Sequence, residues 1–255
     1  MSAASNCSKL AFQRASASAT SGSAAQGARE SAAARAARWK VSFEQFDAAD
    51  KAQAPQPGGV LFVGSSSIRL WDSLDQDFRS QPVLIKRGFG GSRLSDCSDH
   101  LARLVLPYKP RVVVVYAGDN DLAEGATPDE VLASFQRFVE GVRGALPDTH
   151  IAYLSIKPSP LRAALLPQVK VANELIRAYS AGVRDTAYID IHGPMLGQDG
   201  RPRPELFGAD MLHLNAAGYA LWTQAVSRHL EGLAPRAPAA DRATLAAAPA
   251  PHGAR

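Results

Sequence analysis

The sequence predicts a three-layer α/β/α domain with a five-stranded parallel sheet at its centre. Short apolar runs rich in β-branched residues alternate along the chain with longer segments of helical period. Runs such as "VVVVYA" are apolar without interruption, which is typical of parallel strands buried on both faces. The strand candidates are residues 60–64, 82–86, 111–117, 150–156 and 186–190.

Helical segments separate these strands and follow the last one. The clearest, residues 128–146, keeps its apolar side chains on one face. Its start is marked by Thr127 as N-cap, Pro128 in the first turn and Glu130 as the acid of a capping box. A final helix of the same pattern is expected over residues 215–233. The alternation of strand and helix therefore supports the parallel sheet.

The two ends of the chain differ in composition from its middle. Residues 1–38 carry five basic residues against one acid, and residues 236–255 carry three against one. Because the whole chain has a net charge of +4, residues 39–235 carry −2. Both ends are poor in large apolar residues that would offset the entropy of ordering them. We expect one domain over residues 39–235, with a disordered extension on each side.

This distribution of charge argues against nucleic-acid binding, which needs basic groups concentrated on a folded face. No apolar run is long enough for a signal peptide or a membrane span, so stable membrane insertion is not expected. Cys7 and Cys97 lie in a predicted tail and a predicted helix, which does not suggest a disulfide. The expected location is the cytoplasm. The acid-poor N-terminal extension also fits a transit peptide, which would place the protein in an organelle.

Polar residues follow each predicted strand, at the edge of the sheet where parallel α/β domains bind ligands. These segments are "GSSS" (64–67), "GFGGS" (88–92), "GDND" (118–121), "KPSP" (157–160) and, after a longer loop, "DMLH" (210–213). Together they hold hydroxyls, glycine amides, a carboxamide, and an imidazole with a carboxylate three residues before it. A serine activated by such a histidine, with donors for an oxyanion, is the chemistry of acyl transfer.

Each of these groups also has a simpler interpretation. A serine at a helix start is usually an N-cap, and Gly90-Gly91 fits a tight loop. Asn120 could close an Asx turn, and His213 could be a helix-entry residue without chemistry. Their convergence at one edge of the sheet is what favours the catalytic interpretation.

Four segments, in this order, resemble blocks I, II, III and V of the SGNH hydrolases, also called GDSL-type esterases and lipases. The segments are "FVGSSSIRLW", "RGFGGS", "YAGDND" and "DMLHLNAAGY". The likeness spans about residues 39–233 and implies the flavodoxin-like SGNH hydrolase fold. It departs from the family at Ser65, because the usual motif is Gly-Asp-Ser and this chain has Gly64-Ser65-Ser66. The triad acid is a different residue, so the departure bears on substrate preference and on the choice of serine.

The resemblance implies a role for each site residue. Ser66 corresponds to the nucleophile, His213 to its base and Asp210 to the partner of that base. The oxyanion hole would consist of the Ser66 and Gly91 backbone amides and the Asn120 side chain. The implied reaction is hydrolysis of carboxylic esters through an acyl-enzyme, with no cofactor and no metal. The substrate would be a small-molecule or glycan ester, drawn from short acyl esters, acetylated sugars, lipids or thioesters.

Several other interpretations compete with this one. Asp190 and His192 form a second acid–histidine pair at the end of the fifth strand. Asp119 and Asp121 flank Asn120 and could suggest a divalent cation. A dinucleotide fingerprint in "GFGGSR" would need glycine where Arg93 stands. A different class of function is a non-catalytic protein on the same fold that recognises a glycan or an acylated partner.

Basic residues near the predicted edge of the sheet raise the question of an anionic substrate. They are Arg69, Arg87, Arg93, Lys157 and Arg162. Ordinary solvation of a protein surface explains such residues equally well, and it is the interpretation we favour from the sequence.

Overall fold

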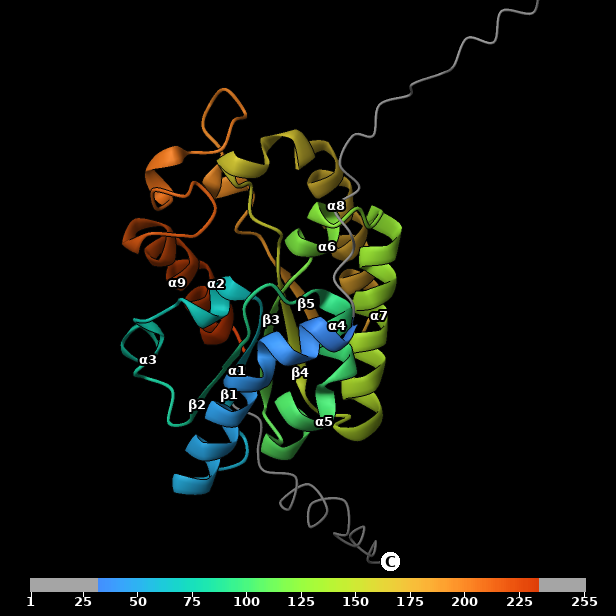
Figure 1. Ribbon diagram of the computed structural model, residues 1–255, viewed down its shortest axis with the longest axis vertical. Helices are drawn as coiled ribbons and strands as arrows, with labels where there is room; N and C mark the ends of the chain where they lie inside the picture. The colour runs from blue at the N-terminus through green and yellow to red at the C-terminus, as the bar shows by residue number, and fades with distance from the viewer. Residues whose placement is uncertain (1–31, 234–255) are drawn as a thin grey trace, which may run out of the picture.

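The computed structural model describes residues 32–233 and contains a five-stranded sheet in which all neighbouring strands are parallel (Figure 1). Its order is β2-β1-β3-β4-β5. The strands are β1 (Val60–Gly64), β2 (Leu84–Gly88), β3 (Val112–Tyr116), β4 (His150–Leu154) and β5 (Thr186–Ile189). Helices flank the sheet, so the predicted three-layer fold is confirmed. Each strand overlaps the segment predicted for it, and β2 lies two residues later than expected.

The strand side chains alternate between two apolar cores, one on each face of the sheet. Leu61 and Val113 belong to the first core, whereas Phe62 and Val114 belong to the second. Helices over the first core are α1 (Ala32–Ala52), α4 (Leu94–Asp99), α5 (Leu101–Leu104), α6 (Asp119–Ala123), α7 (Pro128–Ala145) and α8 (Leu166–Gly182). Those over the second are α2 (Ser66–Arg69), α3 (Leu74–Asp77) and α9 (Ala216–Glu231). In Figure 1, α9 and α7 lie on opposite sides of the sheet.

Both predicted amphipathic helices are present, with the expected start signals. At α7, Thr127 accepts a hydrogen bond from the Glu130 N–H, and Glu130 accepts one from the Thr127 N–H. Asn215 caps α9 by accepting from the N–H groups of Ala217 and Gly218. Across residues 32–233, no helix has the length and apolarity that a membrane crossing requires.

Helix α1 begins within the predicted N-terminal extension. Residues 32–38 are helical, although we expected them to be disordered. Alanine has a high helix propensity, and Trp39 and Phe43 anchor the following turns by packing into the first core. The Trp39 indole N–H also donates to the Gly90 carbonyl at 2.9 Å. The rest of the two expected extensions, residues 1–31 and 234–255, lies outside the described residues.

Candidate active site

The turn from β1 into α2 presents a single serine side chain toward the site. Gly64 has φ +147°, and a Cβ there would lie 1.9 Å from the Tyr116 carbonyl oxygen. Only glycine fits this close approach to the neighbouring strand. Of the three serines that follow, Ser65 and Ser67 are buried, whereas Ser66 is partly exposed at the first position of α2. The fold therefore distinguishes Ser66 from its neighbours.

The structure brings Ser66 together with His213 and Asp210. The Ser66 hydroxyl oxygen lies 2.9 Å from Nε2 of His213, although 147 residues separate the two positions. Nδ1 of the same imidazole lies 2.6 Å from Oδ2 of Asp210. A carboxylate, an imidazole and a hydroxyl thus stand in the order that activates a serine nucleophile.

Asp210 is held by its own loop as well as by the imidazole. Its Oδ1 accepts hydrogen bonds from the backbone N–H groups of Leu212 and His213, at 3.0 and 2.9 Å. The hydrogen bond to the His213 side chain, followed by these backbone bonds, lowers the pKa of Asp210 to about 2. The carboxyl group is therefore ionised at neutral pH, as the partner of a catalytic imidazole must be.

Three N–H groups are the candidates for an oxyanion hole: the backbone N–H groups of Ser66 and Gly91 and the side-chain amide of Asn120. Within residues 32–233, the backbone N–H groups of Ser66 and Gly91 have no hydrogen-bond acceptor. Gly91 has φ +72°, which favours glycine. The Asn120 amide is oriented at both of its ends: Nδ2 donates to the Ser92 carbonyl at 3.0 Å, and Oδ1 accepts from Nη2 of Arg162 at 2.9 Å. One Nδ2 hydrogen remains for a ligand.

A buried ionic cluster lies behind Asn120. Asp119 Oδ2 is 2.7 Å from Nζ of Lys157 and 3.1 Å from Nη1 of Arg162. Lys157 Nζ also donates to the Tyr116 hydroxyl at 3.1 Å. Burial raises the pKa of Asp119, but the charges of Lys157 and Arg162 outweigh it and the pKa is lowered overall. Sequence reasoning missed this cluster. Its signal was the pair of cations in "KPSPLR" (157–162), which begins three residues after the end of β4.

Both acids that flank Asn120 are engaged by the protein itself. Asp119 is paired with the two cations, and both carboxyl oxygens of Asp121 lie 3.1 Å from the Leu94 N–H. Burial raises the pKa of Asp121 to about 7. Over the described range 32–233, His, Cys, Asp and Glu residues form no group of three or more that could hold a metal ion.

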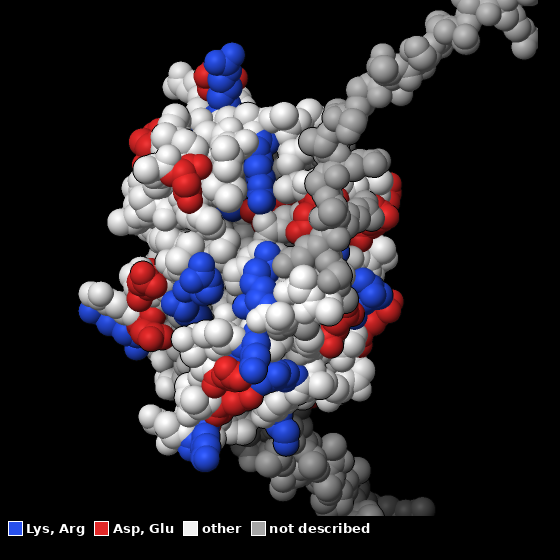
Figure 2. All heavy atoms as spheres, in the orientation of Figure 1, with Lys and Arg blue, Asp and Glu red and all other residues white. Residues whose placement is uncertain are grey.

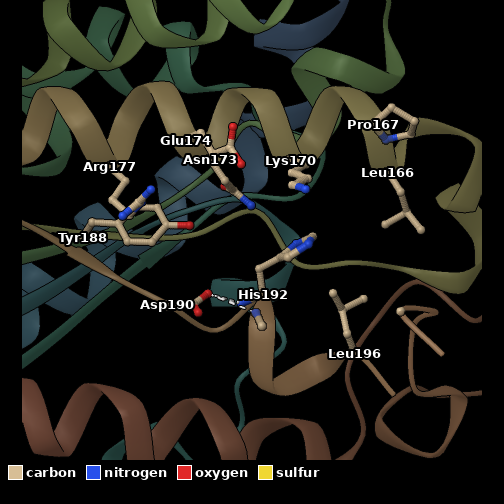
Figure 3. Close-up of a pocket in the computed structure, with 12 residues that line it drawn as sticks. Leu166, Pro167, Lys170, Asn173, Glu174, Arg177, Tyr188, Asp190, His192 and Leu196 are labelled. Atoms are coloured by element: carbon tan, nitrogen blue, oxygen red, sulfur yellow. Dashed lines mark hydrogen bonds between the residues drawn. The ribbon is translucent and has the colours of Figure 1, made fainter. Parts of the chain in front are cut away.

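The second acid–histidine pair is arranged differently. Asp190 Oδ1 accepts from the backbone N–H groups of His192 and Gly193, at 2.9 and 3.0 Å. The His192 ring turns away from this carboxylate, and its Nδ1 lies 3.0 Å from the Ile156 carbonyl oxygen. Figure 3 shows the ring projecting into a separate pocket of about 810 Å³, between α8 and the segment after β5. Ser66 and His213 do not line this pocket.

The sequence model of the GDSL-like lipase/acylhydrolase family matches residues 59–221 of this chain. The chain belongs to this family. The match includes all five site residues considered above, and family membership supports a hydrolase that acts on esters. None of the curated proteins matches the chain.

Solved structures agree with the fold. A candidate platelet activating factor from Streptococcus pneumonia aligns with a TM-score of 0.68 at 18% identity, over 76% of this chain and 93% of the other. A candidate acylhydrolase from Bacteroides fragilis aligns with a TM-score of 0.64 at 21% identity, over 73% and 95%. A GDSL-like lipase from Bacteroides thetaiotaomicron aligns with a TM-score of 0.63 at 20% identity, over 74% and 97%.

Proposed function

We propose that this protein is a serine esterase that cleaves carboxylic esters through an acyl-enzyme on Ser66. The observation that carries the proposal is the hydrogen-bonded series Asp210–His213–Ser66, with distances of 2.6 and 2.9 Å. The substrate is a small-molecule or glycan ester with a short acyl, acetyl or lipid acyl group, or a thioester.

In the first step, the Ser66 oxygen attacks the acyl carbon while Nε2 of His213 takes the hydroxyl proton. The carbonyl oxygen becomes an oxyanion, which accepts hydrogen bonds from the N–H groups of Ser66 and Gly91 and from Nδ2 of Asn120. Ionised Asp210 stabilises the imidazolium and keeps Nε2 directed at the serine. His213 then protonates the alcohol as the tetrahedral intermediate collapses, and the acyl group remains on Ser66.

In the second step, water replaces the alcohol in the site. His213 takes a proton from this water, and the hydroxide attacks the acyl carbon of the ester on Ser66. The same three donors hold the second oxyanion. Collapse returns the proton from His213 to the Ser66 oxygen and releases the carboxylic acid. The histidine acts as base and then as acid in both steps.

The test uses the three adjacent serines as matched variants. Ser66→Ala should lower kcat for a short-chain aryl ester by about 10⁴-fold or more, because the nucleophile is removed. Ser65→Ala and Ser67→Ala should retain activity, since both side chains are buried. A fluorophosphonate probe should label wild type and both of these controls, but not the Ser66 variant. Full activity of Ser66→Ala, or absence of labelling in active wild type, would reject the mechanism. A protein that only binds glycans or acylated partners would neither label nor turn over.

A further inference from the structure

Arginine side chains stand beside each part of the candidate oxyanion hole. Arg69 ends the short helix that begins with Ser66, Arg38 lies against Gly91, and Arg162 contacts Asn120. These three residues are called the arginine rim below. Figure 2 shows blue side chains on either side of a hollow in this face, over α2 and over the segment that follows β4. Two of them, Arg69 and Arg162, belong to residues 39–235, which carry a slightly negative net charge.

Arg69 carries the least compensated charge of the rim. It lies three residues after Ser66 in one helical turn, a spacing that puts two side chains on the same side of a helix. Its Nε lies 3.1 Å from the position that a Cβ of Gly90 would take, in the loop that also contains Gly91. The side chain is exposed, and it has no ion pair or hydrogen bond with any of residues 32–233. The guanidinium is therefore available to a ligand.

Arg38, in helix α1, approaches the same loop. Its guanidinium atoms lie 2.9 to 3.2 Å from the position of a Cβ on Gly91. Nη2 is 3.5 Å from the Gly91 carbonyl oxygen, and the guanidinium lies 5.6 Å from the centre of the Trp39 ring. Substitution of Gly91 would displace this arginine. Because Gly90 and Gly91 have no side chains, the guanidinium groups of Arg69 and Arg38 can lie close to the backbone of this loop.

The third rim arginine belongs to a cluster in which two cations pair with one carboxylate. Arg162 and Lys157 share the carboxylate of Asp119, and the Lys157 and Asp119 side chains are only 1% and 7% exposed. The Asp210 carboxylate also interacts with Lys157 electrostatically. Arg162, whose side chain is 21% exposed, is the member of the cluster that a ligand anion can reach.

The remaining basic residues considered from the sequence are engaged elsewhere. Arg87 is buried and pairs with Asp50, while its Nε donates to the Tyr108 hydroxyl at 2.9 Å. Arg93 lies 3.1 Å from Asp96 and 3.9 Å from Glu124. Surface solvation or ordinary ion pairing accounts for these two. It does not account for three arginines around one set of oxyanion donors.

We infer that the arginine rim binds an anionic group of the substrate, so that the preferred ester carries a carboxylate or a phosphate in addition to its scissile bond. The inference rests on the proposed esterase function. A guanidinium forms paired, charge-assisted hydrogen bonds with such groups, and it remains charged at every physiological pH. Arg69 is the specificity-determining residue, because its charge is unpaired and it lies one helical turn from Ser66.

The test compares esters that differ only in charge. For charge in the alcohol part, 4-acetoxybenzoate is compared with 4-acetoxybenzamide; for charge in the acyl part, monomethyl glutarate is compared with methyl glutaramate. Each kcat/KM is divided by the rate of alkaline hydrolysis of the same ester, which removes differences in intrinsic reactivity. In wild type, the anionic member of at least one pair should be preferred by about tenfold, which corresponds to about 1.4 kcal/mol. The preference should shrink in 0.5 M NaCl, because salt screens exposed charges.

Arg69→Gln should abolish this preference by lowering kcat/KM for the anionic ester about tenfold more than for its neutral partner. Arg69→Lys keeps the charge and should retain part of it, whereas Arg79→Gln, which changes another exposed arginine, should retain all of it. Equal normalised rates for both members of both pairs would overturn the inference. So would an equal loss on charged and neutral esters in Arg69→Gln, which would indicate a structural role. Hydrolysis of the neutral esters that disappears in Ser66→Ala would still uphold the proposed function in either case.

Discussion

Two acid–histidine pairs lie near the same edge of this sheet, and only the first has its imidazole between a carboxylate and a serine hydroxyl. In the first pair, the Asp210 carboxylate faces the His213 ring at 2.6 Å, and the far side of that ring faces Ser66 at 2.9 Å. In the second, the Asp190 carboxylate accepts from backbone N–H groups, and Nδ1 of His192 lies by the Ile156 carbonyl. The residue types are the same in both pairs.

The difference lies in where the imidazole ring points. Asp210 satisfies the N–H groups of its loop with Oδ1 alone, so Oδ2 remains for the imidazole. Asp190 likewise uses Oδ1 for backbone N–H groups, but the His192 ring is directed toward the end of β4 instead. A spacing of two or three residues therefore does not define a catalytic dyad. A catalytic dyad also requires that the ring face the carboxylate on one side and a nucleophile on the other.

The largest expected contrast is between the two histidines. His213→Ala should lower kcat for a short-chain ester by about 10⁴-fold or more, because the general base is lost. His192→Ala should stay within about threefold of wild type, since its ring faces the second pocket. Steady-state kinetics on both variants, with circular dichroism to verify folding, make the comparison. A large loss in the His192 variant with normal folding would break the distinction between the pairs.

The two acids should differ almost as much. Asp210→Asn should lower kcat by about 10³- to 10⁴-fold, because an amide in place of the carboxylate favours the wrong imidazole tautomer. Asp190→Asn should have little effect on kcat, as its contacts are with backbone N–H groups. The measurement is kcat at saturating substrate. Comparable losses in the two variants would mean that both pairs serve the reaction.

The proposed oxyanion donors give a further test, because the mechanism assigns them to the first pair alone. Asn120→Ala should lower kcat by about 10²- to 10³-fold, as found when one such donor is removed from other enzymes. For a neutral short-chain ester, Arg162→Gln should lower kcat by about tenfold with little change in KM, because Arg162 fixes the Asn120 amide at 2.9 Å without touching the oxyanion itself. Near-normal kcat in Asn120→Ala would remove that residue from the mechanism.

The sequence could predict the sheet, the order of its strands along the chain and the edge that holds the site. The continuous apolar runs required burial on both faces, and the parallel arrangement then placed the loops after the strands together. Resemblance to a known family was needed to choose Ser66 among three serines. The sequence could not show that Arg162 reaches Asn120, because its position depends on an irregular segment after β4 with no periodic pattern. Nor could it show which way the His192 ring turns.

The pH dependence offers a smaller test of the first pair. The pKa of Asp210 is lowered to about 2, so its carboxylate stays ionised throughout the range from pH 4 to 8. Loss of kcat/KM toward acid pH should therefore follow one ionisation, protonation of the catalytic base, with a limiting slope of tenfold per pH unit. A slope of a hundredfold per unit in this range would show that a second group must also be ionised. Asp121→Asn removes the other carboxyl group near the site that titrates in this range, because the pKa of Asp121 is raised to about 7. If the steep slope persisted in that variant, it would contradict the assigned state of Asp210.

The smallest effect should come from the second pair and should appear in stability. Asp190→Ala removes the acceptor for the His192 and Gly193 N–H groups, at 2.9 and 3.0 Å, which resembles the loss of a helix N-cap. Losing such a cap costs about 1 kcal/mol of unfolding free energy. Asp190→Asn keeps an oxygen at the same position and should recover most of this cost. Urea unfolding of the two variants and wild type measures the difference. If Asp190→Ala were as stable as wild type, the carboxylate would have no capping role, and the second pair would require another explanation.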